Sequence, residues 1–74
     1  MRQIRLTRHA RNRMRWRQVT ENEIAVVLDA PRRVEAADFG KVRAYAQVSG
    51  RLLKVTYVEE GECIVVISVV VKKG

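Results

Sequence analysis

The sequence is poor in the residues that build disulfide-bonded and metal-binding proteins. Its 74 residues include one cysteine, Cys63, one histidine and one proline. A single cysteine excludes an intramolecular disulfide. Without a CxxC motif or a Cys/His cluster, a zinc site has no basis. Nothing in the sequence indicates a metal or another cofactor, so we expect none.

The sequence also shows no feature of a membrane or exported protein. The longest apolar run, residues 64–71, is far too short to span a bilayer. The first ten residues lack the apolar segment of a signal peptide. We therefore expect a cytoplasmic protein with no membrane partner, and a lone thiol fits that reducing compartment.

Positive charge is what the sequence has in excess. Residues 1–17 carry seven arginines and no acid, whereas residues 18–74 carry eight lysines and arginines against eight acids. The net charge of +7 therefore comes entirely from the first 17 residues. Arginine in this excess favours a polyanion such as nucleic acid, because the guanidinium matches phosphate and guanine edges. A solvated surface helix and an acidic protein partner are the open alternatives.

Two helices are expected in the first half of the chain. Thr7 is the expected N-cap of the first, which runs to Arg17 because its residues favour helix and include no Gly or Pro. The second begins after Thr20, which forms a capping box with Glu23, and it ends before Pro31. Its expected buried stripe consists of Ile24, Val27 and Leu28.

The second half of the chain reads as strands. Residues 41–48 and 51–59 alternate around a Ser-Gly turn, which is typical of a hairpin, and residues 63–71 are apolar on both faces. Residues 32–36 are a short strand or an extended arm, and residues 2–6 are a short strand or the approach to the first helix. We expect one α+β domain over residues 1–74, with two helices on one face of a three- or four-stranded antiparallel sheet.

A helical wheel separates the first helix into three faces. Ala10, Met14 and Arg17 mark a narrow inward face. His9 and Arg13 form a stripe beside Trp16 near the edge of the core, and Arg17 continues this row toward the inward face. The remaining arginines lie well out in solvent, where they would seek phosphates: Arg8, Arg11 and Arg15.

The segment "LTRHARNRMRWRQVTENEIAVVLDAP" resembles the beginning of domain-of-unknown-function family 4258. Members of that family typically read T-x-H-A-x-x-R-M-x-x-R-x-I-x-x-x-x-I, followed by a proline. The matching positions are Thr7, His9, Ala10, Arg13, Met14, Arg17, Val19, Ile24 and Pro31. The likeness extends over nearly the whole chain, although its strands are generic. Several members have an aromatic residue just after the position of Ser68, where this chain has Val69 and Val70.

That family is similar to the RelE-like ribonuclease toxins of the barnase, colicin and RelE group. The resemblance implies a RelE-like arrangement of helices and sheet, together with metal-independent cleavage of RNA. It implies that His9 acts as general acid or base and that Arg13 and Arg17 hold the phosphate. It also implies that Ser68, where the family often has threonine, contacts the substrate.

Each of these residues also has a structural interpretation. His9 could simply occupy the helix surface, and Arg13 and Arg17 could pair with acids of the second helix such as Glu23 or Asp29. Ser68 could be a satisfied hydroxyl within the core. Trp16 could stack on a base or pack at the rim of the core.

The expected partner is RNA, with DNA as an alternative. An acidic antitoxin-like protein and a second copy of the chain are further candidate partners. A non-catalytic binding module is the alternative to a ribonuclease.

Overall fold

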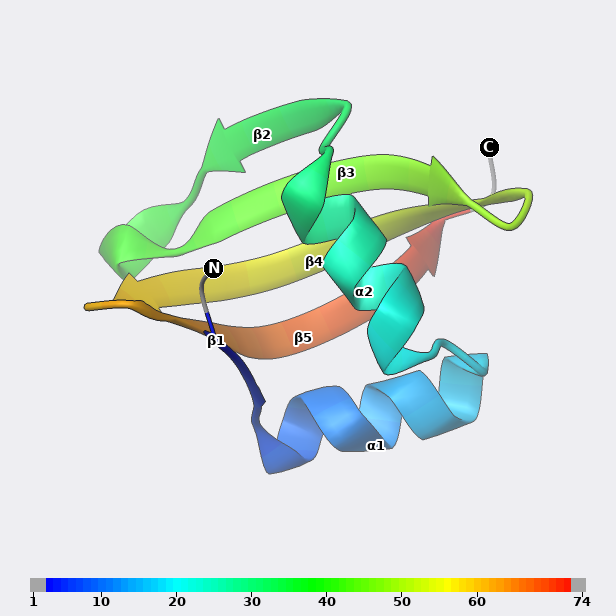
Figure 1. The fold of residues 1–74 in the computed structure, drawn as a ribbon, viewed down its shortest axis with the longest axis horizontal. Coiled ribbons are helices and arrows are strands. Elements are labelled where there is room, and N and C mark those ends of the chain that lie inside the picture. Colours follow the sequence, from blue (N-terminus) through cyan, green and yellow to red (C-terminus); the bar gives the residue numbers. More distant parts are fainter. Residues whose placement is uncertain (1–2, 73–74) are drawn as a thin grey trace.

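The α+β class expected from the sequence is confirmed in the computed structural model, which describes residues 3–72 (Figure 1). The order is β1 (Gln3–Leu6), α1 (Arg8–Arg17), α2 (Glu21–Asp29), β2 (Arg33–Ala36), β3 (Val42–Val48), β4 (Arg51–Glu60) and β5 (Cys63–Lys72). A short 3₁₀ turn, Asp38–Gly40, joins β2 to β3. The described strands form one sheet in the order β1-β5-β4-β3-β2.

The sheet has five strands rather than three or four, and it is mixed rather than antiparallel. The two segments left open by the sequence, around residues 2–6 and 32–36, both become strands; Arg2 itself lies outside the described residues. β1 pairs in parallel with β5, from Gln3 opposite Cys63 to Leu6 opposite Val66. A four-residue strand has too little local pattern to be identified by itself, and its pairing partner lies 60 residues away in the chain.

Both helix starts follow the sequence. The Thr7 hydroxyl accepts a hydrogen bond of 3.1 Å from the Ala10 N–H at the start of α1. Thr20 and Glu23 form the expected reciprocal capping box at the start of α2. The left-handed conformation of Gln18 (φ 55°) ends α1. These caps satisfy backbone groups that a helix terminus otherwise leaves without partners.

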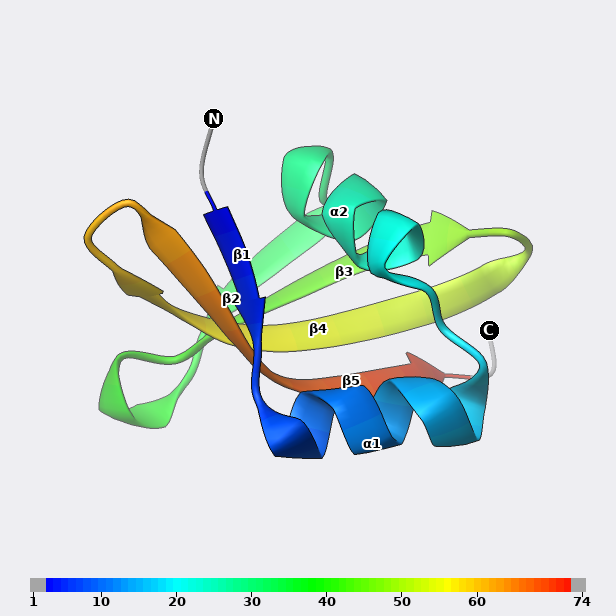
Figure 2. The same ribbon diagram turned by 60° about the horizontal axis from the view of Figure 1, so that its bottom comes forward.

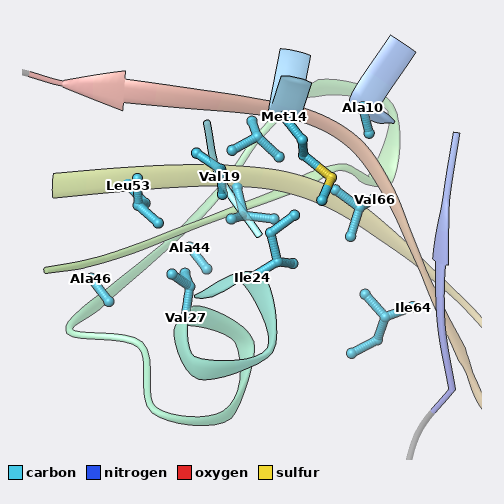
Figure 3. Packing of buried hydrophobic residues seen from close by; sticks show 12 residues of the cluster. Ala10, Met14, Val19, Ile24, Val27, Ala44, Ala46, Leu53, Ile64 and Val66 are labelled. Atoms are coloured by element: carbon cyan, nitrogen blue, oxygen red, sulfur yellow. The ribbon is translucent and has the colours of Figure 1, made fainter. Parts of the chain in front are cut away.

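The core lies between α2, the inner flank of α1 and one face of the sheet (Figure 3). α2 packs on β3 and β4, while α1 packs on β5 and β1. Twelve apolar side chains are buried within residues 3–72. They are Ala10, Met14, Val19, Ile24, Val27, Ala44, Ala46, Leu53, Val55, Ile64, Val66 and Val69.

A β-bulge in β5 joins the strands to the first helix. Thr56 pairs with Ser68 and Tyr57 with Val66, so Ile67 is the extra residue. The Thr7 hydroxyl donates to the Ile67 carbonyl at 3.3 Å, and the Thr7 N–H donates to the Val66 carbonyl at 3.1 Å. Thr7 therefore follows β1, caps α1 and binds the bulged strand through its hydroxyl and its backbone N–H.

The two helices occupy different positions around the sheet. α2 lies across one face, whereas α1 runs beside β5 at the sheet edge, beyond the end of β1 (Figures 1 and 2). In the part of the chain that the structure describes, no helix covers the opposite face (Figure 2). We call this opposite side the open face. Neither helix within residues 3–72 has the length and apolar content that a membrane span requires.

Candidate nucleic-acid interface

The outer flank of α1 brings together most of the site residues expected from the sequence. His9, Arg13, Trp16 and Arg17 line a shallow depression of about 470 Å³, and Asn12 completes it. We call these five residues the α1 stripe. All of them belong to one helix, so the depression is open to solvent and has no opposing wall. Asn12 was missed, although its spacing of three residues from His9 places it on the same side of the helix.

The α1 stripe is not part of the core. Trp16 is 82% exposed, so it does not pack at the core rim. His9, Asn12 and Arg13 are exposed as well. The family motif thus divides in two: Ala10 and Met14 are buried against the sheet, whereas the stripe residues between them face solvent.

The assignment of Arg17 to the inward face of α1 was wrong, because its side chain is exposed. A helical wheel assumes that the helix continues on both sides of each residue. α1 ends at Arg17, and the left-handed conformation of Gln18 changes the direction of the chain there. What Arg17 gives to the fold is its backbone carbonyl, which accepts a hydrogen bond of 2.7 Å from Arg51. The guanidinium of Arg17 stays with the α1 stripe.

The arginines of the α1 stripe have no acidic partner. Pairing with acids of α2 was one interpretation of Arg13 and Arg17, but no carboxylate of residues 3–72 lies within 4.0 Å of either guanidinium. Glu23 instead binds Arg51 at 3.1 Å. Its pKa lies below the ordinary value of 4.5, chiefly because the Thr20 N–H donates to it and also because Arg51 does. Glu23 is therefore engaged in holding the fold together.

The other basic flank of α1 faces α2. Arg11 lies 4.0 Å from Glu21 at the start of α2, a marginal contact between two well-exposed side chains. Arg8 and Arg15 share this flank and are exposed. Because His9 and Arg13 occupy the opposite flank of the helix, the α1 stripe turns away from α2, toward the side of the open face.

Ser68 lies apart from the depression. It stands opposite Thr56 on the open face of the sheet, between buried neighbours on the other face such as Val69. The hydroxyl is half-buried and therefore not the satisfied core group that was the alternative. It does not line the depression that holds His9.

The chemistry available to the α1 stripe follows from its side chains. Guanidiniums bind phosphate oxygens, the indole offers a face for stacking, and the imidazole nitrogens can donate or accept hydrogen bonds. Within the described residues, no group of three or more histidine, cysteine or acidic side chains is placed to hold a metal ion.

Comparison with known proteins gives one match. The family described as a domain of unknown function (DUF4258) matches residues 6–71. Searches of curated proteins and of solved structures each gave no match. The family match includes both helices and every residue of the α1 stripe. Because it covers far more than half of the 74 residues, the chain belongs to the DUF4258 family.

Proposed function

We propose that this domain binds RNA through the α1 stripe. The observation that carries the proposal is a set of exposed arginines without acidic partners beside an indole that is 82% exposed. Like charges spaced four residues apart, such as Arg13 and Arg17, destabilise an isolated helix by a few tenths of a kcal/mol. No carboxylate of residues 3–72 lies close enough to compensate that cost, whereas a phosphate chain would.

The exposed indole favours RNA with unpaired bases. Stacking on an aromatic side chain requires a base that is free of its own helix, and sequence-selective proteins mostly bind RNA in loops and single strands. Each stacked base contributes about 1–3 kcal/mol. Trp16 next to Arg13 and His9 offers stacking and phosphate contacts within two turns of one helix.

Fluorescence anisotropy with a labelled single-stranded RNA tests this proposal. Arg13→Gln should weaken binding about tenfold at low salt, and Lys41→Gln, which removes one positive charge away from α1, should leave it nearly unchanged. Affinity should fall steeply as salt rises, because bound phosphates release counterions. A matched DNA strand should bind more weakly if the ribose hydroxyls are contacted.

Two results would contradict RNA binding through the α1 stripe. One is the absence of affinity at low salt in a folded protein. The other is an equal loss in Arg13→Gln and Lys41→Gln, which would mean that the protein attracts RNA only through its net charge.

Metal-independent RNA cleavage is a second candidate, favoured by the position of His9. Its imidazole shares the depression with Arg13 and Arg17. The resemblance of the family to RelE-like ribonucleases implies a general acid or base at this position. In such a reaction the ribose 2′-oxygen attacks the adjacent phosphorus as it loses its proton. The bond to the 5′-oxygen then breaks as that oxygen gains a proton, which leaves a cyclic phosphate. His9 would serve one of these proton transfers, water the other, and the arginines would stabilise the phosphorane.

Incubation with RNA in EDTA separates cleavage from binding. Cleavage by the unmodified protein that His9→Ala abolishes, while RNA affinity is retained, would establish His9 as the proton-transfer group. Intact RNA after prolonged incubation with a protein that binds it would leave the domain a binding module. An acidic open reading frame beside the gene would favour a toxin–antitoxin pair.

A further inference from the structure

Residues 18–74 have no net charge, but their acidic and basic side chains lie on different parts of the surface. Among the acids of residues 18–72, three lie on α2, one lies in the 3₁₀ turn and three flank the turn between β4 and β5. The remaining acid, Glu35, lies on β2. Four cations occupy alternate positions of the strands, on the face opposite the core: Arg33, Arg43, Lys54 and Lys72. Glu35, which pairs with Arg43, shares this face. The four cations outnumber it, so the open face is positive although the sequence around it is neutral.

A second hollow on this face is centred on Tyr45. The guanidinium carbon of Arg33 lies 5.9 Å from the Tyr45 ring centroid, and the Lys72 ammonium lies 5.7 Å from it. Arg33 also binds Glu35 at 2.7 Å. The hollow has a volume of about 750 Å³ and is completed by Arg32, Gln47 and Leu52.

The polar and charged groups around Tyr45 shift one another's pKa values. The hydrogen bond from Tyr45, followed by the charges of Arg33 and Arg43, keeps the Glu35 pKa below its ordinary value of 4.5. The same hydrogen bond raises the Tyr45 pKa above 10.0, aided by burial and by the Glu35 charge. At neutral pH the Tyr45 hydroxyl therefore keeps its proton and the Glu35 carboxylate keeps its charge.

The hollow offers the chemistry that a nucleotide requires. No carboxylate of residues 3–72 lies within 4.0 Å of Arg32 or Lys72, so both are available for phosphate. Gln47 presents an amide with donors and an acceptor, and Leu52 presents an apolar surface beside the Tyr45 ring. An acidic peptide would use only the cations and would leave the amide and the apolar surface unsatisfied.

The hollow and the α1 stripe lie toward the same side of the molecule. α1 runs along the β5 edge of the sheet (Figure 1). Its stripe lies on the flank opposite Arg11, the residue that contacts α2. Tyr45 on β3 lies two strand spacings from β5, about 10 Å, and the width of α1 adds roughly 10 Å more. Both hollows are thus within reach of one short single strand.

We propose that the hollow around Tyr45 is a second nucleotide subsite for the RNA strand that the α1 stripe binds. This inference rests on the function proposed above. It adds the route that the RNA takes over the surface, from α1 across β5 and β4 to Tyr45. A strand held at two subsites gains affinity because the second contact forms within the complex.

Trp16 fluorescence provides the test, since Trp16 is the only tryptophan and reports on the α1 stripe alone. Quenching is titrated with a dinucleotide, which is too short to reach Tyr45, and with a single strand of about ten nucleotides. Lys72→Gln should weaken binding of the longer strand about three- to tenfold and lower its salt slope by about 1. It should leave the affinity for the dinucleotide unchanged, and the matched control Lys41→Gln should change neither.

The possible outcomes separate this inference from the proposed function. Equal affinities of Lys72→Gln and Lys41→Gln for the longer strand, with binding still lost in Arg13→Gln, would overturn the second subsite alone. Absence of quenching by any RNA would overturn both proposals. Polyglutamate that binds as tightly as RNA of the same charge, and that loses affinity in Lys72→Gln, would show that the hollow binds an acidic protein instead.

Discussion

The side chains from Thr7 to Arg17 divide into those that build the fold and those that the fold leaves in solvent. Thr7 makes the hydrogen bonds that join β1, α1 and the β5 bulge, and Ala10 is completely buried. His9, Arg13 and Trp16 are exposed. A residue type at a motif position is explained by packing in the first group. In the second group packing gives no explanation, and the proposed RNA ligand would supply one.

Thr7→Val should destabilise the domain by about 1–2 kcal/mol, because it removes the cap of α1 and the hydroxyl bond to Ile67 while keeping the branched shape. Urea unfolding measures this loss. Thr7→Ser, which keeps the hydroxyl, should lose less than half as much. An unchanged midpoint in Thr7→Val would show that the joint is not held by these bonds.

At the scale of elements, Arg51 connects three pieces of the fold. From the start of β4, its guanidinium donates to the carbonyls of Arg17 and Gln18 at the end of α1, at 2.7 and 3.1 Å. It also donates to Glu23 in the first turn of α2. This one side chain therefore fixes the corner between the two helices and the β3–β4 hairpin.

Arg51→Lys should destabilise the domain by about 1–2 kcal/mol, because an ammonium keeps the charge but cannot direct a planar fork at two carbonyls and a carboxylate. Chemical denaturation at neutral pH measures the loss. Arg43→Lys is the matched control, since Arg43 is exposed on the open face and should tolerate the exchange. Equal stabilities of the two variants would contradict the role given to Arg51.

The lowered pKa of Glu23 makes this corner sensitive to acid. A carboxylate with a lower pKa in the folded state contributes stability above its ordinary value of 4.5, and that contribution is lost as the pH falls below 4.5 toward the folded pKa. Thermal unfolding between neutral pH and pH values below 4.5 should therefore show a smaller acid-induced loss in Glu23→Gln than in the unmodified protein. A parallel decline in both would contradict the assignment.

The sequence predicted those helices and strands that are determined by residues close to one another in the chain. Caps at Thr7 and Thr20 mark both helix starts, and alternation places Leu53 and Val55 inward with Lys54 outward, as the structure has them. The pairing of β1 with β5 and the bulge at Ile67 depend on contacts 60 residues apart. No local pattern contains that information.

In the candidate site, too, only the part that depends on local spacing could be predicted from the sequence. Helical spacing grouped His9, Arg13 and Trp16 correctly. The same spacing placed Arg17 on the inward face, because helical spacing contains no information on where the helix ends. The hollow around Tyr45 draws side chains from β2, β3, β4 and β5, so it exists only after the sheet has formed.

At the scale of the whole molecule, the charges outside the first 17 residues are also placed unevenly over the surface. Six of the eight acids lie on α2 or beside the β4–β5 turn, whereas the open face and the α1 stripe carry exposed or half-exposed cations. A net charge of +7 attracts any polyanion at long range. The asymmetric placement determines the surface on which a bound strand would lie.

Trp16 fluorescence during titration with single-stranded RNA at low salt tests this arrangement most directly. RNA bound at the α1 stripe should quench the emission in a saturable way, and added salt should reverse the quenching. Unchanged emission from a folded protein whose RNA complex is detected independently would mean that RNA binds elsewhere, and it would contradict the α1 stripe as the binding surface.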